Sequence, residues 1–405
     1  MKTKVLVTGC DMITPAGLNL MSTWDALVKG TSCVRSITRF SCDTLETKIA
    51  AQVDTESFSQ LASQYCRKRL LKQMTLVTRM GLIAAIQAVN DSGIDFSQCD
   101  KRRVAVILGV VNAGYNSLEA EIANDRIVKA MANAPSAWIS LEYGIEGPNF
   151  PISTACASSA YAMAHAYEMI ASGSADIVIT GGTDSTVCPE EIRGFNDILA
   201  LSTRNSSPET ACRPFSLSRD GFVIGEGAGV LIFESEEHAR KRGAQVYAEI
   251  AGYALTSEAY NIVAPKPDGE GMAKTMAQAI RHAGVTPADI QYINAHGTST
   301  PLNDRYETLA IKNVFGEHAK NVLVSSTKSM IGHTIGAAGA IEGITTVMSI
   351  KHGIVTPTIN YDEVDPELDL DYVPNNAVEK DIRVALSNSF GFGGHNATLV
   401  FKKYE

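Results

Sequence analysis

The chain has 405 residues, of which 45% are hydrophobic, and this is enough for one large core or two closely packed halves. Its net charge of -9 and its lack of a basic tract argue against nucleic-acid binding, because clustered Lys and Arg are needed to neutralise phosphates. The N-terminal "KVLVTG" is typical of a strand and turn rather than of a signal peptide, and the apolar runs fall short of the roughly 20 residues of a membrane span. We therefore expect a cytoplasmic protein that binds no membrane.

Short β-branched runs alternate with longer helical patterns along the chain, which predicts an α/β protein with parallel or mixed sheets. Five runs precede residue 240 and five follow it, and the charged "SEEHARKRGAQ" lies between them. We expect two similar halves, residues 1–240 and 241–405, packed against each other. The runs span residues 4–9, 103–110, 150–154, 175–182, 229–235, 246–255, 290–297, 321–327, 383–389 and 396–401.

One cysteine stands out by its surroundings. Cys156, in "ISTACASSAYA", lies among small residues directly before a predicted helix over 157–172, which Gly173 ends. Reactive cysteines favour a helix N-terminus and room for a substrate, whereas structural ones are buried in apolar packing. The eight cysteines contain no C-x-x-C pair and none follows Cys212, so we predict neither a zinc knuckle nor a disulfide framework.

Several common motifs are excluded. The stretch "GFVIGEGAGV" (221–230) spaces its glycines as G-x-G-x-G and precedes a strand, unlike a dinucleotide-binding fingerprint. The chain has no G-x-x-x-x-G-K-[ST], H-E-x-x-H or G-x-S-x-G motif. Phosphate-loop, zinc-protease and serine-hydrolase functions therefore lack their minimal parts.

Three later loops, each after a predicted strand, carry residues suited to chemistry. "NAHGTSTPLND" contains His296, "SSTKSMIGHTIGAAGAIEG" contains Lys328, His333 and Glu342, and "SNSFGFGGHN" contains Phe392. Because ligands of open α/β sheets gather at the carboxyl ends of strands, these loops and Cys156 are expected to converge on one cleft.

A cysteine with two histidines does not match a cysteine protease, which needs one base and one orienting group. Carbon–carbon bond formation from thioesters gives the second histidine a role. A thiolate takes an acyl group, and two neutral imidazoles donate hydrogen bonds to a second thioester while it loses CO2.

Taken together, "STACASSA", "NAHGTSTPLND", "SSTKSMIGHTIGAAGA", "NSFGFGG" and the longer "RPFSLSRDGFVIGEGAGVLIFE" resemble the β-ketoacyl-[acyl carrier protein] synthases, in particular their elongating, FabF-like branch. The likeness covers nearly the whole chain. It implies a thiolase fold, in which two pseudo-symmetric α/β halves form five αβαβα layers, and a dimer.

The resemblance also implies a role for each site residue. Cys156 is the nucleophile, activated by the positive end of its helix, and the backbone N–H groups of Cys156 and Phe392 form the oxyanion hole. His296 and His333 stabilise the malonyl enolate, and the charge of Lys328 keeps them neutral. The remaining roles are orienting residues (Glu342, Asp304), a gating loop (Gly391, Phe392, Gly393, Gly394), pantetheine contacts (Thr298, Thr300) and carrier contacts (Arg69, Lys72, Arg204).

The implied substrates arrive on the phosphopantetheine arm of an acyl carrier protein, so no separate cofactor is expected. The site requires no metal, although some relatives hold a monovalent cation near the positions of Asn294, Glu342, Ser387 and Asn388. The partners are the carrier protein and either a second copy of this chain or a related ketosynthase subunit.

The sequence departs from the family in three places. The stretch between Gly109 and Cys156 is shorter than in typical relatives, Asn261 stands where many relatives have histidine, and His395 stands where threonine is common. With these differences, the sequence is compatible with fatty-acid synthesis and also with polyketide or polyene synthesis.

Two other functions predict a different set of cysteines. A chain-length-factor-like subunit usually lacks the nucleophile, and a coenzyme A-dependent thiolase carries a second cysteine late in the chain. Cys156 with both histidines argues against the first, and the lack of cysteine after Cys212 argues against the second.

Overall fold

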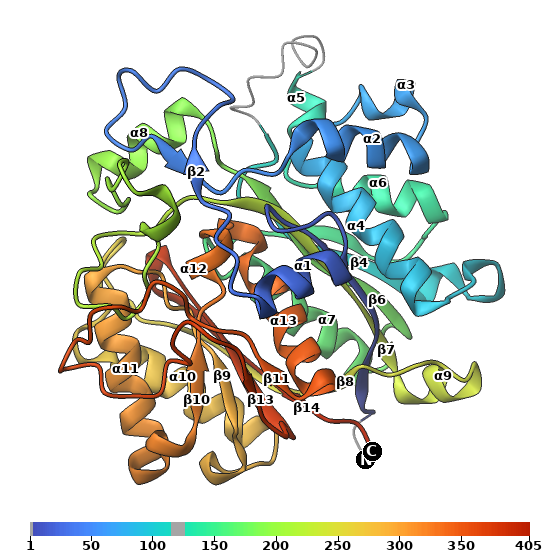
Figure 1. The fold of residues 1–405 in the computed structure, drawn as a ribbon. Helices are drawn as coiled ribbons and strands as arrows, with labels where there is room; N and C mark the ends of the chain where they lie inside the picture. Colours follow the sequence, from blue (N-terminus) through green and yellow to red (C-terminus); the bar gives the residue numbers. More distant parts are fainter. Residues whose placement is uncertain (1–2, 115–125) are drawn as a thin grey trace.

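The computed structural model describes residues 3–114 and 126–405, and it is built on one mixed ten-stranded sheet (Figure 1). The strand order is β10-β9-β13-β14-β8-β1-β7-β6-β4-β5. The strands are β1 (Val5–Ile13), β4 (Val104–Gly109), β5 (Asn149–Ile152), β6 (Ile177–Ser185), β7 (Glu226–Ser235), β8 (Ala248–Ser257), β9 (Tyr292–Asn294), β10 (Leu323–Ser325), β13 (Val384–Gly391) and β14 (His395–Lys402).

The sheet consists of two five-stranded parts with the same topology. The order β5-β4-β6-β7-β1 in the first part matches β10-β9-β13-β14-β8 in the second, counted by position along the chain. In both parts the two pairings nearest the outer edge are parallel and the other two are antiparallel. The parts join through a short antiparallel contact between Val5–Val7 of β1 and Ala248–Ile250 of β8.

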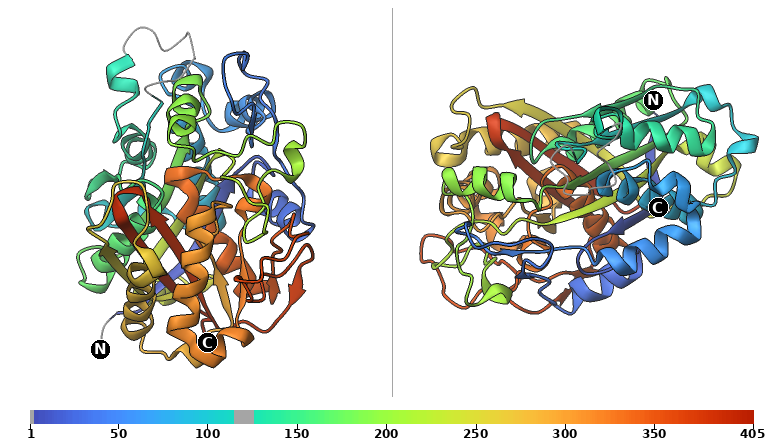
Figure 2. Two further views of the ribbon diagram at one scale, coloured as in Figure 1. Left: turned by 90° about the vertical axis from the view of Figure 1, so that its left-hand side faces the viewer. Right: turned by 90° about the horizontal axis from the view of Figure 1, so that it is seen from above.

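Two helices lie between the sheet parts and form the central layer. The helices α7 (Ser158–Ala171) and α13 (Ala338–His352) pack against each other and against strands of both parts. Helices α4 (Leu76–Ser92) and α6 (Ala134–Tyr143) cover the first part, and α10 (Glu270–His282) and α11 (Pro301–Phe315) cover the second. Viewed from above, the blue and cyan helices lie at one side and the gold and orange segments at the other (Figure 2).

The remaining elements are short and lie mostly at the surface. They are the helices α1 (Leu20–Val28), α2 (Thr55–Tyr65), α3 (Lys68–Leu71), α5 (Arg126–Lys129), α8 (Pro189–Asp197), α9 (Glu236–Lys241) and α12 (Lys328–Ile331), and two small sheets, β2 (Arg35–Ser36) with β3 (Ile49–Ala50) and β11 (Ile354–Val355) with β12 (Val378–Glu379).

The expected α/β fold in two similar halves is confirmed, and each of the ten predicted runs overlaps one strand of the large sheet. The predicted helix over 157–172 is α7, and Gly173 follows its last turn with φ +74°. The predicted boundary at residue 240 falls inside α9. The shortened stretch between Gly109 and Cys156 lies partly outside the described residues. None of the helices in the described ranges is long and apolar enough to cross a membrane.

The first turn of α7 approaches the sheet closely because β4 ends in a glycine. A Cβ added to Gly109 would lie 2.2 Å from the backbone nitrogen of Ser159, well inside van der Waals contact. Since Ser159 stands three residues after Cys156, this approach helps to fix the position of the nucleophile.

We predict that Gly109→Ala lowers the free energy of unfolding by about 1–3 kcal/mol or more, because the backbone of α7 must move away. Denaturant unfolding measures this. The matched control is Gly194→Ala in the exposed helix α8, where an added Cβ meets no atom within 4 Å. It should stabilise the protein by about 0.4–1 kcal/mol, and equal effects of the two variants would refute the close-approach argument.

Candidate active site

Cys156 lies in the turn between β5 and α7, one residue before the N-cap residue Ala157. The preceding residue, Ala155, has φ +49°, a left-handed conformation that non-glycine residues adopt rarely. This sharp bend presents the sulfur to the region between the two sheet parts. Only 5% of the Cys156 surface is exposed.

The structure brings Cys156 together with both predicted histidines. The sulfur and one ring nitrogen from each of His296 and His333 all lie within 4.8 Å of one another. The imidazole centroids are 5.4 Å apart and the rings are nearly perpendicular, at 83°. His296 follows β9 and His333 follows α12, so a first-half sulfur meets two second-half imidazoles.

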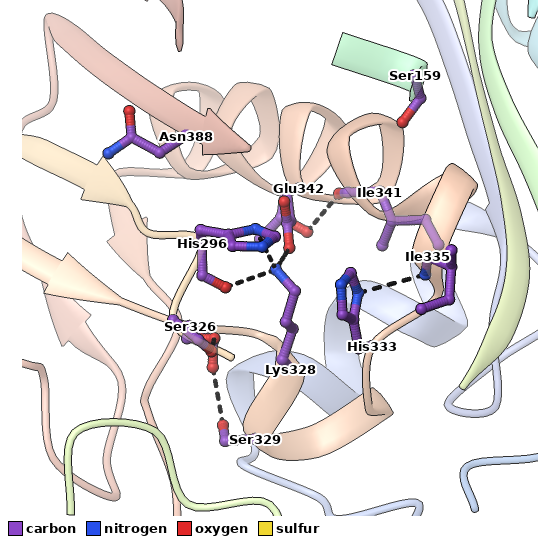
Figure 3. Close-up of polar contacts among 12 residues, drawn as sticks. Ser159, His296, Ser326, Lys328, Ser329, His333, Ile335, Ile341, Glu342 and Asn388 are labelled. Atoms are coloured by element: carbon purple, nitrogen blue, oxygen red, sulfur yellow. Dashed lines mark hydrogen bonds and ion pairs between the residues drawn. The ribbon is translucent and has the colours of Figure 1, made fainter. Parts of the chain in front are cut away.

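The hydrogen bonds of the two rings define which nitrogen carries the proton. The backbone N–H of Ile335 donates to Nδ1 of His333 over 3.3 Å, and Nζ of Lys328 lies 3.4 Å from Nδ1 of His296 (Figure 3). Because an acceptor nitrogen carries no proton in a neutral imidazole, the proton lies on Nε2 in each ring. Nε2 of His333 is buried and has no hydrogen-bond partner among the described residues, so it is a donor available to a substrate.

Both imidazoles are neutral at physiological pH. Burial is the largest cause that lowers the pKa of His296 and of His333 well below the ordinary value, and the charge of Lys328 lowers it further in both. Burial and the Lys328 charge therefore act in the same direction on both imidazoles, and burial contributes more.

A cysteine and two histidines at this spacing also resemble a metal-ligand set. The ring protonation does not fit a metal ion, because the nitrogens with a free lone pair already accept hydrogen bonds from N–H donors. The cationic Lys328 beside them also disfavours a second cation. The arrangement fits donation to an anionic oxygen instead.

Lys328 connects the parts of the site. Its side chain is almost fully buried, and its ammonium group donates to the backbone carbonyl of His296 over 2.6 Å and pairs with Glu342 (Figure 3). Burial raises the pKa of Glu342, and the Lys328 charge opposes that shift. The predicted orienting role of Glu342 matches this contact.

The surroundings of Cys156 oppose ionisation of its thiol more strongly than they favour it. Burial raises the pKa of the Cys156 thiol to about 11, above its ordinary value. The charge of Lys328 and the backbone N–H groups of Phe392 and Cys156 oppose the shift but do not reverse it. The resting site therefore holds a neutral thiol, and the proton leaves as the sulfur attacks.

The Phe392 loop lies against the nucleophile. A Cβ on Gly391 would lie 3.2 Å from the backbone nitrogen of Cys156, so only glycine permits this approach without displacement. Gly393 and Gly394 adopt φ +81° and +74°, and the N–H of Gly393 donates to the carbonyl of Ile262 over 2.8 Å. The loop thereby presents the Phe392 amide to the sulfur.

A cavity of about 280 Å³ leads to the cluster. Thr298 and Thr300 line it, and their hydroxyl oxygens lie 2.8 Å apart. Several large apolar residues that line it are exposed, and we call these the mouth residues: Ile198, Leu199, Val263 and Leu302. The cavity thus connects the surface with Cys156.

Two carboxylates of α11 fix the loop that carries His296. Asp304 accepts from the backbone N–H of Phe215 over 2.8 Å and lies near Arg219, so it anchors the loops rather than Lys328. Sequence reasoning missed Glu307, which accepts from the backbone N–H groups of His296 (2.9 Å) and Gly297 (2.8 Å). Burial raises the pKa of Glu307 to about 7. The sequence signal that could have identified Glu307 is its spacing, because Asp304 and Glu307 stand three residues apart and share one buried face of α11.

The predicted carrier contacts differ in exposure. Arg69 and Lys72 are exposed on and directly after the short helix α3. Arg204 is half-buried, and its guanidinium donates to the carbonyl of Ser218 over 3.1 Å. Arg204 is therefore less accessible to a partner protein than Arg69 and Lys72 are.

The two unusual residues near the gate have structural roles. Asn261 accepts with Oδ1 from the N–H groups of Val263 (2.8 Å) and Ala264 (3.0 Å), forming an Asx turn beside the mouth. The ring of His395 packs edge-on against Tyr161, with centroids 6.1 Å apart. Both residues shape the loops around the cavity.

The predicted cation position is oxygen-rich and buried. Ser387 and Asn294 are register partners on β13 and β9, and Asn388 and Glu342 are buried as well. Oε2 of Glu342 has no hydrogen-bond partner within the described ranges. The side chain of Asn388 instead bonds to Glu307 (3.2 Å) and to Thr398 (2.8 Å).

Comparisons with known proteins agree with this geometry. The models of the β-ketoacyl synthase N-terminal and C-terminal domains match residues 2–239 and 247–362. The chain is 42% identical to 3-oxoacyl-[acyl-carrier-protein] synthase 2 of Staphylococcus aureus over 416 residues, which covers 99% of both chains.

Two solved structures superpose over the full length of both chains, each with a TM-score of 0.91 and 33% identity. One is a type II polyketide ketosynthase in complex with its acyl-carrier protein and bound to the hexaketide, and the other is the ishigamide ketosynthase/chain length factor. The fold and the site define a thioester-condensing acyltransferase. The chain belongs to the β-ketoacyl synthase family.

We predict that alkylation of Cys156 by iodoacetamide accelerates about 10-fold per pH unit from pH 7 and levels off only near pH 11, because only the thiolate reacts. Mass spectrometry of the Cys156 peptide follows the rate. Lys328→Met, combined with Glu342→Gln to leave no unpaired carboxylate, should slow the reaction at pH 9. A plateau at or below pH 8 in the unmodified protein would contradict the raised pKa.

Proposed function

We propose that the chain is a β-ketoacyl-[acyl carrier protein] synthase that condenses an acyl group on Cys156 with malonyl-carrier protein. The observation that carries this proposal is the meeting of one neutral thiol with two neutral imidazoles that are protonated at Nε2, where Nε2 of His333 has no hydrogen-bond partner among the described residues. The reaction is redox-neutral and its substrates bring their own pantetheine arm, so no dissociable cofactor is invoked.

The first stage is acyl transfer. The Cys156 sulfur attacks the carbonyl of the acyl-carrier thioester, and the backbone N–H groups of Cys156 and Phe392 stabilise the oxyanion. The carrier thiol leaves with the proton that Cys156 gives up. The acyl group is then held on Cys156 while the carrier is replaced.

The second stage is decarboxylation and condensation. Nε2 of His296 and of His333 donate to the malonyl thioester oxygen, so that CO2 leaves and an enolate remains. The enolate carbon attacks the Cys156 acyl carbonyl, the carbon–sulfur bond breaks, and the departing thiolate takes up a proton from water. The products are β-ketoacyl-carrier protein, CO2 and the free thiol.

The carrier is proposed to dock over the mouth residues, with Thr298 and Thr300 along its arm and Phe392 gating the two stages. The exposed cations Arg69 and Lys72 provide a local basic surface on a chain of net charge -9, which suits an acidic partner. Arg204 is proposed to contribute by supporting the neighbouring loops.

We propose a dimer in which the partner, identical or related, covers the outer side of β5. This strand ends the large sheet and carries the exposed Phe150, and the exposed Leu141, Ile127 and Val128 lie on the neighbouring helices α6 and α5. An exposed strand edge beside large apolar side chains is a favourable site for association.

The remaining assignments rest on the family and on local geometry. The halves are proposed to be residues 1–240, with the nucleophile, and 241–405, with both histidines, in a cytoplasmic protein. A monovalent cation would be held by Glu342, Asn294, Ser387 and Asn388, where it would hold that carboxylate and the strand ends in place.

A chain-length-factor-like role is the second candidate, since one solved structure of the same fold is a ketosynthase/chain length factor. The intact Cys156–His296–His333 cluster favours catalysis over this role.

Two variants separate the two stages. We predict that Cys156→Ala abolishes acyl transfer but retains malonyl decarboxylation, and that His333→Ala slows decarboxylation about 100- to 1000-fold through loss of one donor. Radiolabelled acyl transfer and CO2 release measure the stages separately. His165→Ala, an exposed histidine on α7, is the matched control. Full condensation by Cys156→Ala would refute the function.

A charge reversal tests the basic surface. We predict that Arg69→Glu with Lys72→Glu raises KM for carrier-bound acyl groups about 10-fold and leaves turnover of a short pantetheine thioester unchanged, because the cations act only on the carrier. The control is Lys274→Glu with Arg281→Glu, two exposed cations on α10. An unchanged KM would exclude residues 69 and 72 from the interface.

A further inference from the structure

A second cysteine lies beside a histidine–carboxylate pair, far from the cavity. Cys99 follows a short 3-10 turn (Phe96–Gln98), and its sulfur lies 3.5 Å from the backbone carbonyl oxygen of Asp95 and 4.0 Å from Nε2 of His238 on α9. Nδ1 of His238 in turn contacts Glu234 on β7 over 2.5 Å. Since Gly225 bonds to His333 and Glu234 stands nine residues further along an extended strand, the two sites are roughly 25–30 Å apart.

The carboxylate fixes the orientation and protonation of the imidazole. Glu234 is buried, and although burial alone raises its pKa, hydrogen bonds from Arg242 and His238 bring it down to about 2. When the His238 imidazole donates its Nδ1 proton to the ionised Glu234, the Nε2 lone pair faces the Cys99 sulfur. This is the nucleophile–base–carboxylate order that activates thiols and hydroxyls in enzymes.

From this geometry we infer that Cys99 is a second nucleophilic thiol, at which His238 acts as the base, and that it forms mixed disulfides with low-molecular-weight disulfides. The Cys99 sulfur attacks one sulfur of the disulfide, whose sulfur–sulfur bond breaks as the new one forms. The Cys99 proton passes to Nε2 of His238 and then to the departing thiolate. One protein mixed disulfide and one small thiol result, and no further oxidant is needed.

The charges around Cys99 make the base necessary. Burial, and then the charge of Glu234, raise the pKa of the Cys99 thiol, while Arg242 lowers it and Asp95 and Asp176 raise it. Little thiolate therefore exists at neutral pH, and reaction depends on proton transfer to His238 during attack. Loss of that base should have a larger effect here than at an ordinary surface cysteine.

The chain contains its own controls. Cys33 and Cys42 are half-buried like Cys99, but among the described residues their sulfurs contact the backbone carbonyls of Thr31 at 3.8 Å and Phe40 at 3.7 Å and no imidazole. Burial raises the pKa of both thiols as well. They therefore differ from Cys99 chiefly in lacking a nearby imidazole.

The experiment treats the full chain with dithiobis(nitrobenzoate) at pH 7 and follows each cysteine peptide by mass spectrometry. Cys99 is expected to react about 10-fold faster than Cys33 and Cys42. His238→Gln is expected to reduce the Cys99 rate to theirs without changing theirs. Equal rates for the three cysteines in the unmodified chain, or a Cys99 rate that His238→Gln leaves unchanged, would overturn the inference.

A second variant separates the loss of the base from a looser structure. Arg240→Gln alters an exposed cation on the same helix that pairs with Glu236, and it leaves His238 in place. It should preserve the Cys99 rate. If His238→Gln merely loosened α9, Cys99 would become more accessible and react faster, which would also overturn the inference.

Discussion

The buried ammonium group of Lys328 influences the protonation of the groups around it, although burial has the larger effect. Its charge is compensated by Glu342 and by the carbonyl of His296, as a buried cation requires. The same group lies at Nδ1 of His296 and lowers the pKa of both imidazoles and of Cys156. Loss of this single charge would therefore change the pKa of both imidazoles, of Cys156 and of Glu342 at once.

Burial and this charge act together on the histidines and against each other on the thiol. Both favour neutral imidazoles, whereas burial outweighs Lys328 at Cys156 and leaves a neutral thiol. Exchange of an acyl group between two thiols needs a thiolate only during attack. Donation to an enolate, by contrast, needs imidazoles that stay neutral and keep Nε2 protonated. The arrangement suits both stages of a thioester condensation.

The strands of the large sheet and the loops that carry the site could be predicted from the sequence, because both have clear local patterns. The ten β-branched runs each became a strand, and the parallel pairing of β9, β10 and β13 places His296, Lys328 and Phe392 at one edge.

The small sheets β2–β3 and β11–β12 were not predicted, since two-residue strands form only through tertiary contacts. The role of Glu307 was not predicted, because it consists of hydrogen bonds from the backbone N–H groups of a loop that lies 10 and 11 residues earlier in the chain. The pKa of Cys156 could not be predicted either, since it reflects burial by loops from both halves.

The backbone conformations at the site show why sequence patterns predict local structure least well there. Among the described non-glycine residues with positive φ, Ala155, Leu199, Ser299 and Ile335 all lie at or beside the cavity. Ala155 precedes the nucleophile, Ile335 donates to His333, and Ser299 separates the two cavity threonines while its hydroxyl accepts from the N–H of Arg213. Each such conformation costs on the order of 1–3 kcal/mol, so it persists only where surrounding packing enforces it. The central layer and the two sheet parts supply that packing, and the strained residues in turn direct N–H groups, rings and the sulfur toward one point.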